Sequence, residues 1–141
     1  MSRFNIEALR EAVYWMLAEA AKAKMGLSSE WDQRDWFRRS GHYMNNTDGS
    51  PLVSSQFDCG TTCCLAGHIA EVQGARPEWT NGPITGRVRT ADGRSEFIPH
   101  YAEKVLGITG QEATDLFWES MTSESVLATA KQIALNHGET L

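Results

Sequence analysis

A first helix is predicted where apolar side chains recur at helical spacing between Ile6 and Ala20. Asn5 precedes this stretch as a residue that caps free amides, and Gly26 follows it as a stop signal. Ser29, with Asp32 three positions later, is expected to start a short second helix. That helix would carry three aromatic side chains, Trp31, Trp36 and Phe37. The N-terminal part of the chain is therefore predicted to be helical.

The middle of the chain is predicted to hold a long loop followed by a central helix. Residues 41–56 are rich in Asn, Ser, Asp, Gly and Pro and show no apolar period, which is typical of a surface loop. From Thr62 to Gln73 the apolar residues return at helical spacing. Gly74 then stands where a left-handed C-terminal residue is favoured. We expect one central helix over 62–73.

A β-hairpin is predicted after the central helix. Residues 87–91 and 94–98 flank Asp92-Gly93, a dipeptide that tolerates the two positive φ angles of a tight two-residue turn. Three more helices follow, and their signals are Pro99 with a stop at Gly107, a capping box of Thr109 with Glu112, and Ser123 as a cap with a stop at Gly138.

The order of these elements indicates an α+β fold in which helices dominate. We expect a single domain over residues 1–141, with one β-hairpin or a small antiparallel sheet. A domain of this size buries roughly two-thirds of the surface that its unfolded chain exposes, so one core is sufficient. The hydrophobic content of 41% and the charged content of 22% are ordinary for a folded protein, which argues against disorder.

Charge and hydropathy exclude several classes of function. The formal net charge is −5 and no long basic run is present, so broad binding to duplex nucleic acid is not expected. The chain start leads directly into an amphipathic pattern, with no apolar signal core and no apolar stretch long enough to span a bilayer. We therefore expect a cytoplasmic protein that has no membrane partner.

The three cysteines, Cys59, Cys63 and Cys64, lie within six positions of one another. This arrangement does not fit the disulfide framework of a secreted domain, so their use is packing, metal binding or reactivity. Cys59 stands just before the predicted central helix, and Cys63 stands in its first turn. Free amides and the positive end of the helix macrodipole stabilise a thiolate there and lower a cysteine pKa from about 8.5. A reactive cysteine is therefore expected at this place.

Asp58-Cys59, followed by a small residue and a helix, is similar to the nucleophile segment of NlpC-type cell-wall peptidases. Cys59-Gly60-x-x-Cys63 also resembles the Cys-Gly-x-Cys of papain, and the two families share one fold. The resemblance implies a papain-like fold in which Cys59 is the nucleophile and a histidine on a facing strand is the general base. Those families carry a larger antiparallel sheet after the nucleophile helix, whereas the pattern here predicts two strands.

His100 is the candidate general base, because it directly follows the predicted hairpin, which could carry it towards the helix start. In this hydrolase hypothesis Cys59 attacks a carbonyl or phosphorus centre, and His100 takes and returns the proton. The substrate would be a peptide, an amide or a small signalling nucleotide, and no cofactor is expected. Asp58 or Asp92 would orient the imidazole. The backbone amides of Thr61 or Thr62 would stabilise the oxyanion.

Two other uses of the cysteine segment stay open. A small metal-binding domain would draw on four side chains, namely Cys59, Cys63, Cys64 and His68. Structural zinc sites usually take ligand pairs from two separated segments, and no second Cys-x-x-Cys or His-x-x-x-His pair is present. The other use is packing, in which Cys63 and Cys64 act as small apolar residues in a close helix contact. We favour packing for these two cysteines.

The segment from Cys59 to Ala70 also resembles the Cys-Gly-Thr-x-x-Cys-x-Ala-Gly-Trp-x-Ala signature of small uncharacterised proteins from tailed phages and bacteria, especially actinobacteria. His68 stands where this group has a tryptophan. The resemblance identifies Cys59 and Cys63 as the signature cysteines and implies a phage-type accessory protein in the host cytoplasm. It covers roughly residues 57–120, through Ala102, Leu106-Gly107-Ile108 and Leu116-Phe117.

Small phage proteins of this kind often act on host enzymes or host defence, which suggests a second hypothesis of another class. The protein would be a non-catalytic inhibitor or sequestering protein that binds a host protein or a small signalling nucleotide. Its surface would combine aromatic and basic residues, namely Trp31, Trp36, Phe37, Arg34, Arg38 and Arg39. We prefer the alternative that these aromatics turn into the core. The hairpin arginines are expected only to protect its edges, and they are Arg87, Arg89 and Arg94.

Overall fold

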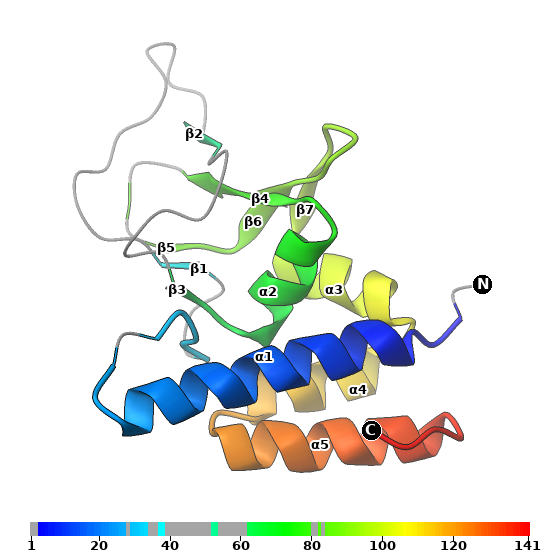
Figure 1. Cartoon of the computed structure of the whole chain (residues 1–141). Helices are drawn as coiled ribbons and strands as arrows, with labels where there is room; N and C mark the ends of the chain where they lie inside the picture. Colours follow the sequence, from blue (N-terminus) through cyan, green and yellow to red (C-terminus); the bar gives the residue numbers. More distant parts are fainter. Residues whose placement is uncertain are drawn as a thin grey trace.

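The chain was analysed as a computed structural model, which describes residues 3–27, 29–33, 63–79, 82 and 84–141, and the backbone alone of 37–38, 52–53 and 62. The described residues form five α-helices, one π-helix and seven short strands (Figure 1). The predicted α+β class with dominant helices is confirmed.

Helix α1, Ile6–Lys24, confirms the first predicted helix. The side chain of Asn5 accepts a hydrogen bond from Ala8 N at 3.1 Å, and Gly26 adopts a φ of 77° after the helix. Complete burial of one large aliphatic side chain is worth about 1.5–3 kcal/mol. The face of α1 turned to the core is therefore its main source of stability, and it presents Leu9, Ala12, Val13, Met16 and Ala20.

The second predicted helix is wrong. Residues 29–33 form a bend and a turn, and strand β1 covers Phe37–Arg38. Cys63, thirty positions further along the chain, donates its N–H to Glu30 O at 2.8 Å and accepts from Asp32 N at 2.8 Å. Pairing with a distant strand thus replaces the local helical bonds that the cap signal predicted.

The strands form two small antiparallel sheets. The first has the order β3-β1-β5, in which β3 is Thr62–Cys63 and β5 is Ile84–Thr85. The second has the order β2-β4-β6-β7, in which the strands are Leu52–Val53, Arg76–Trp79, Arg87–Arg89 and Ser95–Phe97. Most of the predicted loop over 41–56 lies outside the described residues. Strand β2 falls within that stretch, so the absence of an apolar period did not mean the absence of a strand.

The predicted hairpin is formed by β6 and β7, but its turn is longer than two residues. Thr90 N donates to Arg94 O at 2.7 Å, which leaves a three-residue loop. Gly93 N donates to Thr90 O at 2.9 Å, and Gly93 has a φ of 91°. A three-residue loop with a left-handed glycine also matches the twist of the flanking strands. The hairpin is confirmed, and the two-residue turn is wrong.

The C-terminal helices follow the predicted signals. Helix α3, Ile98–Leu106, ends at Gly107 with a φ of 67°. The capping box of Thr109 and Glu112 starts α4, Gly110–Thr114, which continues as the π-helix η1, Asp115–Glu119. Helix α5, Ser123–Asn136, begins one residue after its cap, which is Thr122 rather than the predicted Ser123.

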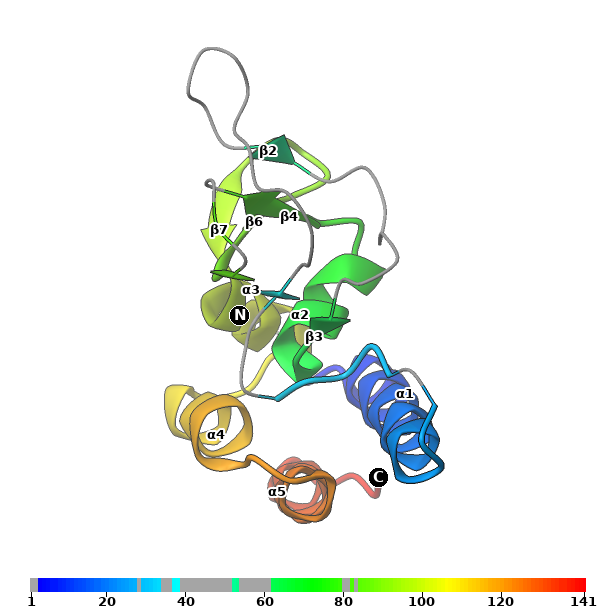
Figure 2. The same ribbon diagram turned by 90° about the vertical axis from the view of Figure 1, so that its left-hand side faces the viewer.

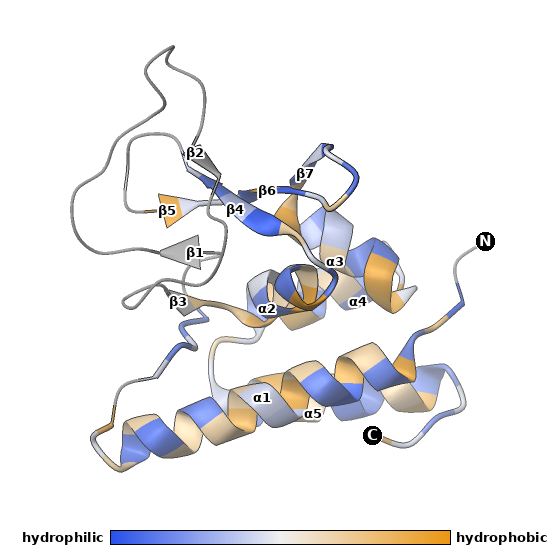
Figure 3. Cartoon of the chain, turned by 45° about the horizontal axis from the view of Figure 1, so that its top comes forward, coloured by the Kyte–Doolittle hydropathy of each residue, from blue (hydrophilic) through white to orange (hydrophobic). Residues whose placement is uncertain are grey.

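The helices pack in layers beneath the sheets. Helices α1 and α5 lie side by side and run in opposite directions, and α2, Leu65–Val72, lies between α1 and the strands (Figures 1 and 2). Figure 3 shows orange and blue residues alternating along α1, as expected for a helix with one buried face. The buried apolar residues belong to one cluster that draws on α1, α2, α3 and α5.

None of the described helices combines the length and the apolar composition that crossing a membrane would require.

Candidate functional site

The structure describes only some of the predicted site residues. Asp58, Cys59 and Thr61 lie outside the described residues, and so does the environment of the predicted nucleophile. Thr62 lies in β3, where its backbone pairs with Arg38, and its side chain is outside the description. The candidate site therefore consists of described residues that follow Thr62 in the Cys59–Ala70 segment, together with the residues that contact them.

Helix α2 starts later than predicted. It begins at Leu65, after strand β3 and the cap residue Cys64, which has a φ of −82° and a ψ of −177°. Cys59 precedes the first helical residue by six positions, with a strand in between. The macrodipole acts mainly within the first turn of a helix. The predictions that Cys59 lies just before the central helix and that Cys63 lies in its first turn are therefore wrong.

The thiol of Cys63 lies in the hydrophobic core. Cys63 is 0% exposed and Cys64 is 1% exposed. Burial raises the pKa of the Cys63 thiol well above its ordinary value, and the neighbouring Cys64 and Glu71 act in the same direction. A buried neutral thiol is a poor nucleophile and behaves as a small apolar side chain. The packing role predicted for both cysteines is confirmed.

The 29–33 segment, which pairs with Cys63, is tied to α1 by the buried carboxylate of Glu19. Glu19 Oε1 accepts a hydrogen bond from Glu30 N at 2.7 Å, and Glu19 Oε2 lies 2.6 Å from Lys22 Nζ. Burial acts to raise the pKa of Glu19, but the hydrogen bonds from Lys22 and Glu30 N outweigh it and lower the pKa. The carboxylate therefore stays charged and anchors the segment.

Gln33, at the end of this segment, caps α2. Its Oε1 accepts hydrogen bonds from Leu65 N and from Trp31 Nε1, both at 3.2 Å. Its Nε2 donates to Leu116 O at 3.4 Å, and the residue is buried. The amide of Leu65, the first of α2, thus donates its hydrogen bond to a side chain of the protein.

The predicted aromatic surface is described only in part. Trp31 is half-buried and packs against the core, which confirms the expectation that it turns inward. Arg34, Trp36 and Arg39 lie outside the described residues, as do the side chains in β1.

His100, the predicted general base, lies in the first turn of α3 with an exposed side chain. Its ring meets Phe97 edge to face with the centroids 5.4 Å apart, and it forms no hydrogen bond with any residue that the structure describes. Asp92, one of the two predicted orienting residues, instead accepts hydrogen bonds from Thr90 Oγ1 and Arg94 Nε. The hydrogen bond from Thr90 and the bond and charge of Arg94 lower the pKa of Asp92. This carboxylate serves the hairpin turn.

The arginines of the hairpin have hydrogen-bond or ion-pair partners nearby. The hairpin of β6 and β7 and the neighbouring strand β4 are mainly hydrophilic in Figure 3. A carboxylate at hydrogen-bond distance offsets the charge of a guanidinium, whereas a neutral hydroxyl only accepts its hydrogen bond. The pairs are Arg87 Nε with Ser95 Oγ at 3.1 Å, Arg89 with Glu78 at 2.7 Å, and Arg94 with Glu96 at 2.8 Å. This arrangement agrees with the expectation that these arginines serve the hairpin.

His68 joins α2 to α1. Its ring lies flat on Trp15 with the centroids 4.0 Å apart and the planes at 4°, and its Nε2 is 3.0 Å from both carboxylate oxygens of Glu11. These contacts give the imidazole a structural role. In the described part of the chain, no group of three or more His, Cys, Asp or Glu side chains is placed to hold a metal ion.

A groove of about 480 Å³ runs between η1 and α5. Its lining includes the carboxylates of Glu112, Asp115 and Glu119 and no Lys or Arg from the described residues. Burial acts to raise the pKa of Glu112, but hydrogen bonds from Thr109 N, His137 and Asn136 lower it, so that the carboxylate stays charged. The groove is therefore acidic.

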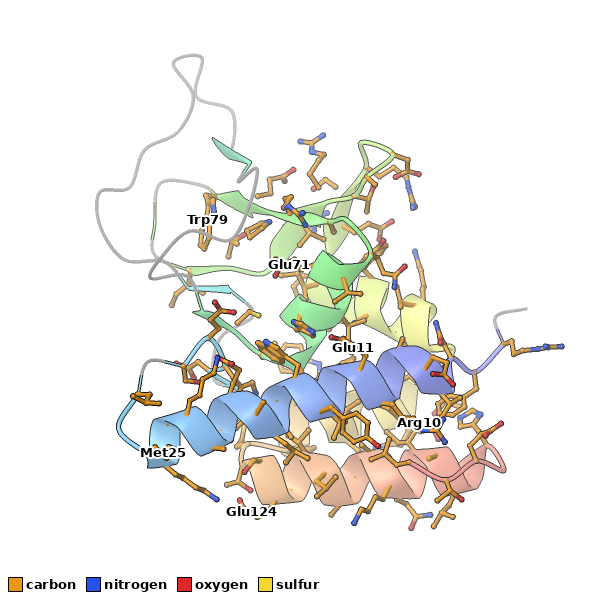
Figure 4. All side chains as sticks on the ribbon, viewed as in Figure 1. Arg10, Glu11, Met25, Glu71, Trp79 and Glu124 are labelled. Atoms are coloured by element: carbon orange, nitrogen blue, oxygen red, sulfur yellow. The ribbon has the colours of Figure 1, made fainter. Side chains whose placement is uncertain are left out.

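Glu71 is a residue of interest that the sequence analysis missed. It lies in the last turn of α2, below the strands, as labelled in Figure 4. Its Oε2 is buried without a hydrogen-bond partner, and burial raises the pKa of Glu71 to about 7 against the attraction of Arg76. The only sequence signal was an acidic residue within the apolar run Ile69-Ala70-Glu71-Val72.

No family model matches the chain, and neither does any curated protein or solved structure. The class of the protein is therefore defined by its own fold and residues, as a small α+β protein with a buried cysteine pair under a central helix.

Proposed function

We propose that this protein is a non-catalytic accessory protein of the phage type, which acts by binding another protein, and that its cysteine signature serves to build the fold. The observation that carries the proposal is the burial of Cys63, one of the two signature cysteines, in the hydrophobic core. A cysteine that packs beneath α2 accounts for its place in the signature without a reaction.

The described surroundings favour binding over cysteine hydrolysis. General-base catalysis needs an oriented imidazole, and an oxyanion site needs amides that are open to the substrate. The imidazole of His100 is exposed and has no hydrogen bond to a described group, while Asp92 is held in the hairpin turn. The amides expected at the oxyanion belong to Thr61, which lies outside the described residues, and to Thr62, whose backbone pairs with Arg38 in the sheet. A binding role requires none of these groups.

A protein partner with a basic surface fits the charge of this chain better than an anionic nucleotide does. The net charge is −5, and the groove between η1 and α5 is lined by Asp115 and Glu119. Next to these residues in the chain, Trp118 and Met121 are 53% and 48% exposed. Large side chains of this kind often contribute strongly to protein interfaces. Opposite charge adds specificity and a faster approach, whereas phosphate groups would be repelled.

Thiol alkylation measured as a function of pH tests the structural role of the cysteines. We expect Cys63 and Cys64 to resist iodoacetamide in the native protein and to react fully after unfolding, because both are buried. We expect the alkylation of Cys59 not to depend on a histidine. Its rate should be the same in the wild type and in His100→Ala, with modification at each cysteine measured by mass spectrometry.

The opposite result would restore the hydrolase hypothesis. A Cys59 pKa well below the ordinary value, raised again by His100→Ala, would mean that an imidazole activates the thiol. Screening of peptides, amides and cyclic nucleotides as substrates would then be justified, and the non-catalytic proposal would be abandoned.

Zero-length crosslinking tests the binding role. A carbodiimide couples carboxylates to lysines in contact, so host proteins that dock on the groove should crosslink through Asp115 or Glu119. Reversal of both charges, with Asp115→Lys and Glu119→Lys, should remove these crosslinks, because the coupling carboxylates are lost and a basic partner surface is repelled. The matched control is Glu7→Lys with Glu139→Lys, which changes the net charge equally at exposed positions elsewhere. Crosslinks that persist in the groove variant would contradict the acidic groove as the binding surface.

A further inference from the structure

Glu71 carries a buried carboxyl oxygen without a hydrogen-bond donor. The residue lies in the last turn of α2, and its Oε2 accepts no hydrogen bond although the atom is shielded from solvent. Buried polar atoms in folded proteins are paired with few exceptions, and an unpaired carboxylate is more costly than an unpaired neutral group. The geometry therefore favours the protonated form of this side chain.

The charges around Glu71 favour the same form. The C-terminal end of a helix carries the negative end of its macrodipole, which opposes a second negative charge there. Glu30, from the 29–33 segment, adds repulsion. Arg76 of β4 attracts a charged Glu71, but its Nη1 donates to the backbone carbonyls of Glu71 and Ala75 at 3.3 and 2.9 Å. The guanidinium of Arg76 thus also bonds to backbone oxygens.

The turn beside Glu71 connects α2 to the second sheet. Gly74 N donates to Glu71 O at 2.9 Å, and Ala75 N donates to Ala70 O at 3.2 Å. These bonds close the helix and lead into β4, which carries the buried Trp79. A charge on Glu71 would act directly on this junction.

We propose that Glu71 is a proton switch of the fold: its neutral carboxyl group holds the junction between α2 and β4 closed, and its ionisation loosens that junction. This inference does not depend on the proposed binding role.

The direction of the pH effect follows from the two states. Burial raises the pKa of Glu71 from 4.5 to about 7, so the folded protein holds this proton more tightly than the unfolded chain does. The contribution of Glu71 to stability is fully present below pH 4.5 and is lost as the pH rises through about 7. The junction is therefore expected to be closed in mildly acidic solution, with Glu71 about half ionised near pH 7, and to be loosened in alkaline solution.

Hydrogen exchange of the full-length chain tests the switch. In the wild type, the protection factors of the Gly74 and Ala75 amides should fall about tenfold or more between pH 6 and pH 8.5, after correction for the intrinsic exchange rate. In Glu71→Gln they should stay constant. The amide of Glu139, which donates to Ala134 O at 2.8 Å beyond α5, serves as the internal control and should not respond.

Infrared spectroscopy of the wild type provides a second readout that does not require the variant to fold. The carbonyl band of a protonated carboxylic acid should be present at pH 6 and should disappear as the pH rises through about 7. The proposal is overturned if this band is missing at pH 6, or if the junction amides of wild type and Glu71→Gln respond alike to pH.

Discussion

Gly107→Ala is expected to destabilise the protein by about 3 kcal/mol, which corresponds to a melting temperature lower by roughly 10 °C. Gly107 has a φ of 67°, in the left-handed region that disfavours a side chain. A Cβ atom there would also lie 2.3 Å from Arg3 O and 2.7 Å from Arg3 C. Both atoms belong to the backbone, so neither can turn away. Thermal unfolding followed by circular dichroism measures the effect.

The matched control is Gly138→Ala, at the end of α5. Gly138 has a φ of 75°, and no heavy atom of the described residues lies within 4 Å of its Cβ position. This variant carries only the cost of the left-handed backbone, about 1 kcal/mol. Equal losses for the two variants would show that the contact between Gly107 and Arg3 does not form in solution.

The same contact explains how the N-terminus enters α1. Asn5 N donates to Leu106 O at 2.7 Å, so the chain crosses the end of α3 before the helix begins. Phe4 then stacks on His137, with ring centroids 4.3 Å apart, and joins the two ends of the chain. The glycine in the signature-like Leu106-Gly107-Ile108 is thus required by a close backbone approach, which the sequence alone showed only as a helix stop.

The parts of the fold that could be predicted from the sequence are those determined by local interactions. Asn5, the capping box of Thr109 with Glu112, and the glycine after α3 each act within a few residues, and each was predicted correctly. The hairpin was also visible, although the hydrogen bond between Thr90 and Arg94 made its turn one residue longer. Local signals therefore located helix ends to within about one residue in the C-terminal half of the chain.

The errors fall where distant segments pair. The 29–33 segment has a helix-like cap signal, but Glu30 O and Asp32 N bond to the backbone of Cys63, and Glu30 N bonds to the side chain of Glu19. For the same reason Thr62 and Cys63 form a strand, although they continue the apolar period of α2. A period of apolar residues does not reveal which backbone groups are already bonded to another segment. The predicted position of Cys59 relative to the helix was affected by this error.

In the candidate site, too, some features could be predicted from the sequence and others could not. That Cys63 and Cys64 pack in the core was predicted from the sequence, where they were expected to act as small apolar residues in a helix contact. The roles of Gln33 and Glu71 could not, because each depends on what surrounds a polar side chain after folding. A buried glutamine that caps a helix 32 positions away and a buried carboxyl without a donor have no local sequence signature.

Gln33→Leu is expected to destabilise the protein by about 3 kcal/mol, because the substitution leaves several buried polar groups unpaired. The leucine side chain has nearly the same size but offers no acceptor to Leu65 N or Trp31 Nε1 and no donor to Leu116 O. The start of α2 and the 29–33 segment should therefore separate more often. Urea unfolding measures the loss of stability, and the native-state rate of Cys63 alkylation should rise as the segment opens.

Gln132→Leu is the matched control for this variant. Gln132 is exposed on α5, and its Nε2 donates to Asn136 Oδ1 at 2.9 Å in contact with solvent. Its replacement should change stability by no more than about 0.5 kcal/mol, since water replaces the lost partner. A Gln33→Leu protein that is as stable as this control, with Cys63 still protected, would contradict the role of Gln33 as the cap of α2. Loss of both stability and protection would show that the position of the buried cysteine depends on one glutamine.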